Sequence, residues 1–151
     1  MSIEAKLAEK GITLPAAPAP AANYVPFVQS GNLVFISGQI SANESGLITG
    51  KLGAGMDVKA GAEAARRCGL ALIAQLKAAI GDLDRVARVV KLTGFVNSTD
   101  DFTDQPKVIN GCSDLMVEIF GDAGRHARAA VSAPSLPLGV AVEIEAIFEV
   151  K

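Results

Sequence analysis

The sequence predicts one α+β domain, in which a single mixed β-sheet carries two helices on one face. Three observations lead to this prediction. Short apolar runs with the period of a strand stand near both ends of the chain. Two longer runs with the period of a helix lie between them, each followed by a strand. The resulting order, β-β-α-β-α-β-β, places strand–helix–strand units between two terminal hairpins, which we expect to be antiparallel.

The N-terminal region is predicted to contain a short helix and an extended arm. Apolar residues at helical spacing, followed by Gly11, indicate a helix over Ser2–Lys10. The segment "LPAAPAPAAN" (14–23) is rich in proline, which favours an extended backbone. We therefore expect residues 1–23 to precede a single domain that spans residues 24–151.

A hairpin and a loop are predicted next. In "YVPFVQSGNLVFISGQ", two apolar runs flank Gly31 and Asn32, a pair that suits a type II′ turn. The following segment, "NESGLITGKLGAGMD", has the composition of a loop. It does not match a phosphate-binding loop, because Lys51 is followed by Leu52 and not by Ser or Thr.

Two helices are predicted between capping residues. The first is capped by Asp57, runs to about Ile80 and is stopped by the next glycine. The second is capped by Asp104 or Thr103, has a proline in its first turn, and is stopped by Gly121. Glycines inside the first helix reduce its intrinsic stability, and close packing on the sheet is the expected reason.

Three further strands are predicted at 85–96, 128–132 and 140–150. The last strand alternates strictly, so its two faces can be assigned. Glu143 and Glu145 fall on the face away from the helices, together with Ile147. A face that is both apolar and acidic suggests partial burial by another subunit. The face toward the helices is expected to carry Val140, Val142, Ile144, Ala146, Phe148 and Val150.

Composition excludes several classes of function. The formal net charge is -2 and the longest basic run is Arg66-Arg67, so the basic stripe of a nucleic-acid-binding protein is missing. No stretch approaches about 20 uninterrupted apolar residues, so no transmembrane helix and no membrane partner are predicted. The N-terminus lacks the apolar region of a signal peptide, which favours a cytoplasmic location with reduced thiols.

Few side chains are available for catalysis. His126 is the single histidine, which argues against a catalytic zinc site and a Ser-His-Asp site, and a position on the surface or at a site rim is favoured. Cys68 and Cys112 fall on apolar helix stripes and are interpreted as core residues. No metal site and no cofactor is predicted. Arg128 and Glu143 are either a carboxylate-binding and water-activating pair or an interstrand salt bridge, and the residues alone favour the salt bridge.

The sequence resembles the Rid (reactive intermediate deaminase) or YjgF-like family, also labelled endoribonuclease L-PSP or translation inhibitor. The resemblance covers residues 24–150 and rests on three segments. They are "YVPFVQSGNLVFISGQI", "GDLDRVARVVKLTGFVNSTDDF" and "ARAAVSAPSLPLGVAVEIEAIFEV". It implies a chorismate-mutase-like fold that assembles as a homotrimer, with ligand pockets between subunits.

The resemblance also implies a function and a set of site residues. Family deaminases hydrolyse imine or enamine acids, such as 2-aminoacrylate or 2-iminobutanoate, to 2-keto acids and ammonia without a cofactor. Arg128 is then expected to hold the substrate carboxylate and Glu143 to activate the water. Tyr24 is expected to line the pocket from the neighbouring subunit. The backbone at Gly38 is expected to approach the ligand, with Asn110 as a weaker match.

Two departures from the family pattern bear on the substrate. Ala130 stands where the archetypal deaminases have cysteine, and "ANYVP" stands where they have "GPYSQ". These differences leave open a non-catalytic protein that binds or senses carboxylate metabolites. An endoribonuclease is disfavoured by the acidic balance of the chain.

Overall fold

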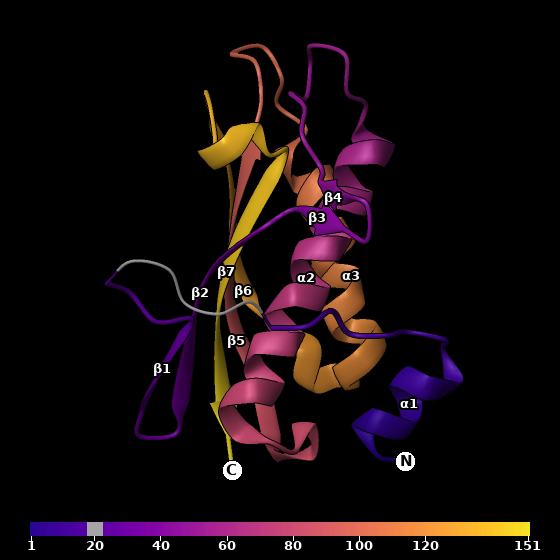
Figure 1. The fold of residues 1–151 in the computed structure, drawn as a ribbon, viewed down its shortest axis with the longest axis vertical. Helices are drawn as coiled ribbons and strands as arrows, with labels where there is room; N and C mark the ends of the chain where they lie inside the picture. The colour runs from indigo at the N-terminus through magenta and orange to yellow at the C-terminus, as the bar shows by residue number, and fades with distance from the viewer. Residues whose placement is uncertain (18–22) are drawn as a thin grey trace.

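The computed structural model of the chain describes residues 1–17 and 23–151 (Figure 1). Part of the predicted proline-rich arm therefore lies outside the described residues. The helices and strands follow the predicted order, with two additional short strands. Their bounds are α1 Ile3–Glu9, β1 Phe27–Ser30, β2 Leu33–Ile40, β3 Ala42–Asn43, β4 Gly46–Leu47, α2 Val58–Ile80, β5 Val86–Asn97, α3 Gln105–Phe120, β6 Ala127–Ala133 and β7 Val142–Val150.

Five strands form one mixed sheet in the order β1-β2-β7-β5-β6. The β5–β6 pair is parallel and the other pairs are antiparallel. Helices α2 and α3 lie against the same face of this sheet, and α1 lies beyond α3 (Figure 1). The predicted α+β class, with one mixed sheet and two helices on one face, is confirmed.

The predicted C-terminal hairpin is wrong. Strands β6 and β7 are not neighbours, because β5 lies between them. The connection at 134–141 crosses the end of β5, where the Asn97 N–H donates to the Ala141 carbonyl and the Ser98 N–H donates to the Ala133 carbonyl. This connection is longer than the two to five residues that usually join hairpin strands. Its length allows β5 to lie between β6 and β7.

The ends of the helices follow the predicted capping residues. The Asp57 side chain accepts a hydrogen bond from the Ala60 N–H and so caps α2. Gly81 and Gly121 end α2 and α3 with φ of 79° and 64°, values that favour glycine. Asp104 precedes α3, but its side chain makes no capping hydrogen bond.

The glycines of α2 were predicted to pack against the sheet, but they face α3. A Cβ atom at Gly69 would press on Cys112 and Leu115 of α3, and one at Gly61 would press on Val108. The glycines of α2 therefore serve packing against α3, and not packing against the sheet. Cys68 and Cys112 are fully buried, as their apolar surroundings predicted. Cys112 lies against Gly69 of α2, whereas the Cys68 thiol lies 3.5 Å from the Val142 carbonyl oxygen of β7.

Strand β7 alternates as predicted. Its even-numbered residues from Val142 to Val150 are buried under the helices, and its odd-numbered residues face away from them. The strand begins at Val142, two residues later than expected. The glycine-rich segment was predicted to be a loop throughout, but it contains the small β3–β4 hairpin, turned at 44–45.

Candidate functional site

Strand β2 contains a bulge beside Glu143. The register with β7 passes from Ile36 opposite Ala146 to Gln39 opposite Ile144, so β2 carries one extra residue between these pairs. Gly38 lies in this bulge. A Cβ atom at Gly38 would overlap the Glu143 carboxylate. The missing side chain at position 38 therefore allows the carboxylate to lie against the β2 backbone.

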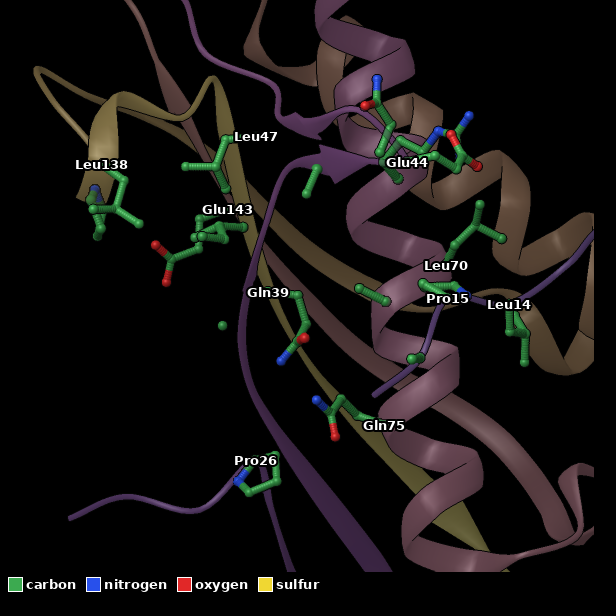
Figure 2. A pocket seen from close by; sticks show the side chains of 18 of the residues that line it. Leu14, Pro15, Pro26, Gln39, Glu44, Leu47, Leu70, Gln75, Leu138 and Glu143 are labelled. Carbon is green, nitrogen blue, oxygen red and sulfur yellow. The ribbon is translucent and has the colours of Figure 1, made fainter. Parts of the chain in front are cut away.

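A cavity of about 860 Å³ opens around this bulge. It is bounded by β2, α2, the β3–β4 hairpin and the loop before β7 (Figure 2). Tyr24, Gly38 and Glu143 all line it, so the structure brings these three predicted site residues together in one chain. Tyr24 was expected to reach the site from a neighbouring subunit. In the structure, Tyr24 lines the same cavity as Glu143 of its own chain.

On the helix-free face, Glu143 is half-buried and is paired with apolar residues of both neighbouring strands. Ile40 on β2 and Phe95 on β5 are its register partners, and Glu145 follows two residues later on the same face. Desolvation, and then repulsion from Glu145, raise the pKa of Glu143 above its ordinary value. A carboxylate with a raised pKa is a stronger base than an ordinary one, which suits proton transfer.

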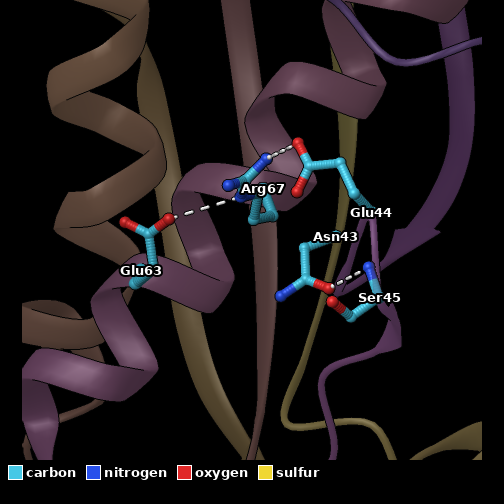
Figure 3. A network of polar contacts seen from close by, with 5 residues as sticks. All are labelled: Asn43, Glu44, Ser45, Glu63 and Arg67. Atoms are coloured by element: carbon cyan, nitrogen blue, oxygen red, sulfur yellow. Dashed lines mark hydrogen bonds and ion pairs between the residues drawn. The ribbon is translucent and has the colours of Figure 1, made fainter.

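The far end of the cavity carries an arginine that is already paired. Arg67 on α2 contacts Glu44 at 3.1 Å through Nη1 and Glu63 at 3.3 Å through Nε (Figure 3). A backbone hydrogen bond, together with Arg67, lowers the pKa of Glu44. Because two carboxylates balance this guanidinium, its charge is already compensated within the chain.

Arg128 lies elsewhere, at the start of the edge strand β6. Its Nη1 donates to Asn110 Oδ1 at 2.8 Å and to Ser113 Oγ at 3.1 Å, both on α3. The structure thus brings the predicted residues Arg128 and Asn110 together. Ser113 was not singled out from the sequence, although its spacing of three residues from Asn110 on one helix face could have indicated it.

Arg128 and Glu143 lie on opposite faces of the sheet. Arg128 is level with Leu92, which faces the helices, whereas Glu143 is level with Phe95, which faces away from them. Strand β5 also separates their strands, which is roughly 10 Å across the sheet at the usual strand spacing, and their partners on β5 are three residues apart, which is roughly 10 Å along it. The predicted interstrand salt bridge is therefore wrong. A three- or four-carbon acid cannot touch both side chains within one chain.

Two glutamines of the cavity were also missed. The amide groups of Gln39 and Gln75 point toward one another between β2 and α2 (Figure 2). Both residues are almost fully buried. The β2 bulge turns Gln39 toward the helices, and the sequence carries no sign of that bulge except the glycine at position 38.

Leu138 lines the same cavity with 73% of its surface exposed, and its φ is 59°. A leucine in this left-handed region is strained. Among the residues described, no helix is long and apolar enough to cross a membrane. No cluster of three or more His, Cys, Asp and Glu side chains that could hold a metal ion occurs in the same part of the chain.

Comparison with known proteins places the chain in a family. The family described as "YjgF/chorismate_mutase-like, putative endoribonuclease" matches residues 4–149. The chain is 52% identical over 149 residues to protein TCP17 of Trypanosoma cruzi, covering 97% of this chain and 93% of that one. It is 31% identical over 142 residues to a 2-iminobutanoate/2-iminopropanoate deaminase of Dermatophagoides farinae, covering 93% and 95%.

A solved structure shares the fold of this chain. Protein Atu1372 of Agrobacterium tumefaciens, described as of unknown function, is 47% identical to this chain. The two structures superpose with a TM-score of 0.90 over 99% of this chain and 94% of that one. The chain therefore belongs to the YjgF/chorismate mutase-like family.

Proposed function

We propose that the protein hydrolyses the imine form of small 2-amino acid derivatives to 2-keto acids and ammonia. The substrates are of the 2-aminoacrylate and 2-iminobutanoate type. The observation that carries this proposal is the division of the site into two parts. One part is a basic carboxylate with a raised pKa, Glu143, in a cavity. The other is an arginine, Arg128, whose guanidinium is held by α3 and still open to solvent.

The two parts complement each other only between chains. Because one chain holds them on opposite faces, a ligand that touches both requires Arg128 of one chain to face the Glu143 cavity of the next. Such a head-to-tail contact closes into a ring, and a homotrimer is the ring that we propose. The exposed apolar side chains on the helix-free face and around the cavity support burial by a neighbouring copy. They are Tyr24, Val28, Phe35, Leu47, Val131 and Leu138.

The proposed reaction needs only these side chains and water. Arg128 binds the substrate carboxylate with the planar fork of its guanidinium. Glu143 takes a proton from a water molecule as the water oxygen bonds to the imine carbon. That proton then passes to the nitrogen and gives a carbinolamine. Glu143 next moves the hydroxyl proton of the carbinolamine to its amino nitrogen, the carbon–oxygen double bond forms as the carbon–nitrogen bond breaks, and ammonia leaves a 2-keto acid. An enamine such as 2-aminoacrylate enters after it tautomerises to the imine.

The relative named as a 2-iminobutanoate/2-iminopropanoate deaminase supports this substrate class. The direct test generates 2-iminobutanoate with a threonine dehydratase and follows the release of 2-oxobutanoate and ammonia. We expect the protein to accelerate release above the buffer rate, and Arg128→Ala and Glu143→Gln to abolish the acceleration.

Matched controls lie close to each residue. Arg125→Ala removes an exposed arginine that pairs with Asp122, and Glu145→Gln removes a carboxylate two residues from Glu143 on the same face. Both are expected to retain activity. A wild-type rate equal to buffer, or full activity of Arg128→Ala, would contradict the proposal. Binding of 2-oxobutanoate without turnover would instead identify a non-catalytic metabolite-binding protein, which the altered segment 23–26 also suits.

A further inference from the structure

A line of hydrogen bonds extends behind Arg128 into the protein. Arg128 Nη1 donates to Ser113 Oγ, which lies 2.9 Å from His126 Nε2, and His126 Nδ1 lies 2.6 Å from the Gly124 carbonyl oxygen. The carbonyl oxygen can only accept, so Nδ1 carries the ring proton. In the neutral ring Nε2 then accepts from the Ser113 hydroxyl. Every donor in the line therefore points from Arg128 toward Gly124.

This line determines which edge of the guanidinium remains open. Nη1 has two hydrogens, and Asn110 and Ser113 accept both. Among the described residues, no side chain or carbonyl accepts from Nε or Nη2 of Arg128. A guanidinium has two edges that bind a carboxylate bidentately, Nη1–Nη2 and Nε–Nη2. The first is blocked by α3, so a carboxylate ligand meets the Nε–Nη2 edge.

We propose that Ser113 and His126 are positioning residues that hold Arg128 with its Nε–Nη2 edge toward the substrate carboxylate. The inference rests on the proposed function and adds to it the residues that orient the carboxylate anchor. Arginine has several rotatable bonds, and ordering them costs entropy when a ligand binds. A guanidinium that is already held by Asn110 and Ser113 avoids most of this cost.

Local sequence places the four side chains in two matched pairs. His126 immediately precedes β6 and Arg128 is its second residue, and the two side chains reach the same Ser113 hydroxyl from one side of the chain. Asn110 and Ser113 are three residues apart on α3, so they are neighbours on one helix face. The pair before and in β6 therefore faces the pair on α3, and their four side chains can form one line of hydrogen bonds.

Two glycines bring the backbones close enough for these contacts. A Cβ atom at Gly94 of β5 would overlap Ile109, so a larger residue there would push α3 away from the sheet. A Cβ atom at Gly124 would overlap the Met116 carbonyl oxygen. Gly124 is thus seated directly on the backbone of α3. The position of the Gly124 carbonyl oxygen, which accepts the hydrogen bond from His126 Nδ1, is therefore fixed by this packing.

The test compares binding of 2-oxobutanoate, measured by calorimetry, with turnover. Ser113→Ala removes the hydroxyl, and His126→Leu removes the acceptor behind it. Each is expected to weaken binding about tenfold, the loss of one positioned charge-assisted hydrogen bond, while kcat falls less than threefold. His126→Gln places an amide oxygen near the position of Nε2 and is expected to restore affinity. Ser132→Ala, which removes a β6 hydroxyl bonded to Ser98, is the control without effect.

A double-mutant cycle separates positioning from general structural support. In the Arg128→Ala background, Ser113→Ala is expected to cause no further loss of binding, because its effect acts through Arg128. A further loss in that background, or unchanged binding by Ser113→Ala alone, would overturn the positioning role while the proposed function stands. A wild-type protein that neither binds 2-oxobutanoate nor turns over the imine would overturn both.

Discussion

The carboxylate of Glu143 occupies the space that a side chain at Gly38 would need. The two residues come from neighbouring strands, and the bulge in β2 brings them together. The position of the proposed base is therefore determined by the absence of a single methyl group. This relationship can be tested by substitution.

Replacing Gly38 with alanine is expected to displace the Glu143 carboxylate. The φ of Gly38 is not in the left-handed region, and the overlapping atom is the far end of a flexible side chain. The protein should therefore fold, with a loss of stability below about 1 kcal/mol. Imine hydrolysis should fall by about tenfold to a hundredfold, because small displacements of catalytic groups are costly. Thermal unfolding measures the loss of stability, and the coupled dehydratase assay measures the loss of activity. A fully active Gly38→Ala variant would show that the position of the Glu143 carboxylate does not matter for the reaction.

Activity is expected to decline in acid at a higher pH than an ordinary glutamate would cause. The pKa of Glu143 is raised, first by desolvation and then by Glu145, and only its ionised form accepts a proton. As pH falls through this raised pKa, the rate should fall with it. Glu145→Gln removes the second cause, so the acid limb should move to lower pH. A pH–rate profile in the two proteins checks the prediction, and coincident profiles would contradict it.

Inactive variants are expected to complement each other if the site lies between chains. Arg128→Ala retains Glu143, and Glu143→Gln retains Arg128, so a mixed assembly contains some interfaces with both residues. After unfolding and refolding a 1:1 mixture, about a quarter of the sites should be intact in a closed ring. Turnover should then reach about a quarter of the wild-type rate. Each variant refolded alone is the control, and no recovery in the mixture would contradict a site that is shared between chains.

The two cysteines are expected to resist thiol reagents in the folded protein. Burial raises the pKa of Cys112 to about 12, and burial together with the neighbouring Cys112 and Glu143 raises that of Cys68. Since the thiolate is the reactive form, neither should be labelled at pH 8. Both should react after unfolding in guanidinium chloride, as counted with a chromogenic disulfide. Rapid labelling of the native protein would contradict the prediction and show that the core between the helices and the sheet opens.

Local signals in the sequence predicted the elements but not their neighbours. Asp57 and Gly81 mark the ends of α2, because capping depends on residues close in sequence. The alternation of β7 assigned Glu143 to the correct face. The insertion of β7 beside β5 depends on pairing between distant residues. The proline-bearing connection at 134–141 resembled a hairpin turn in sequence, so that prediction failed.

The candidate site was predictable to a similar degree. Tyr24, Gly38 and Glu143 line one cavity and Arg128 contacts Asn110, so the residues that the family resemblance grouped in one pocket lie at two places in the chain. Their separation onto two faces of the sheet follows from the strand order, which the sequence pattern did not reveal. Ser113 was not singled out from the sequence, and His126 was expected at the surface or at a site rim without a named partner. Their contact depends on how closely α3 approaches the sheet.

The strand order also has a consequence for how the chain folds. Strand β7 follows every other strand in the sequence, yet it fills the gap between β2 and β5. Until it enters, both of those strands present unpaired edges, which are prone to associate with other chains. Closure of the sheet requires contacts between residues far apart in sequence, a topology that slows folding. A nascent chain without β7 is therefore an open and aggregation-prone intermediate, and the strand that carries Glu143 also completes the fold.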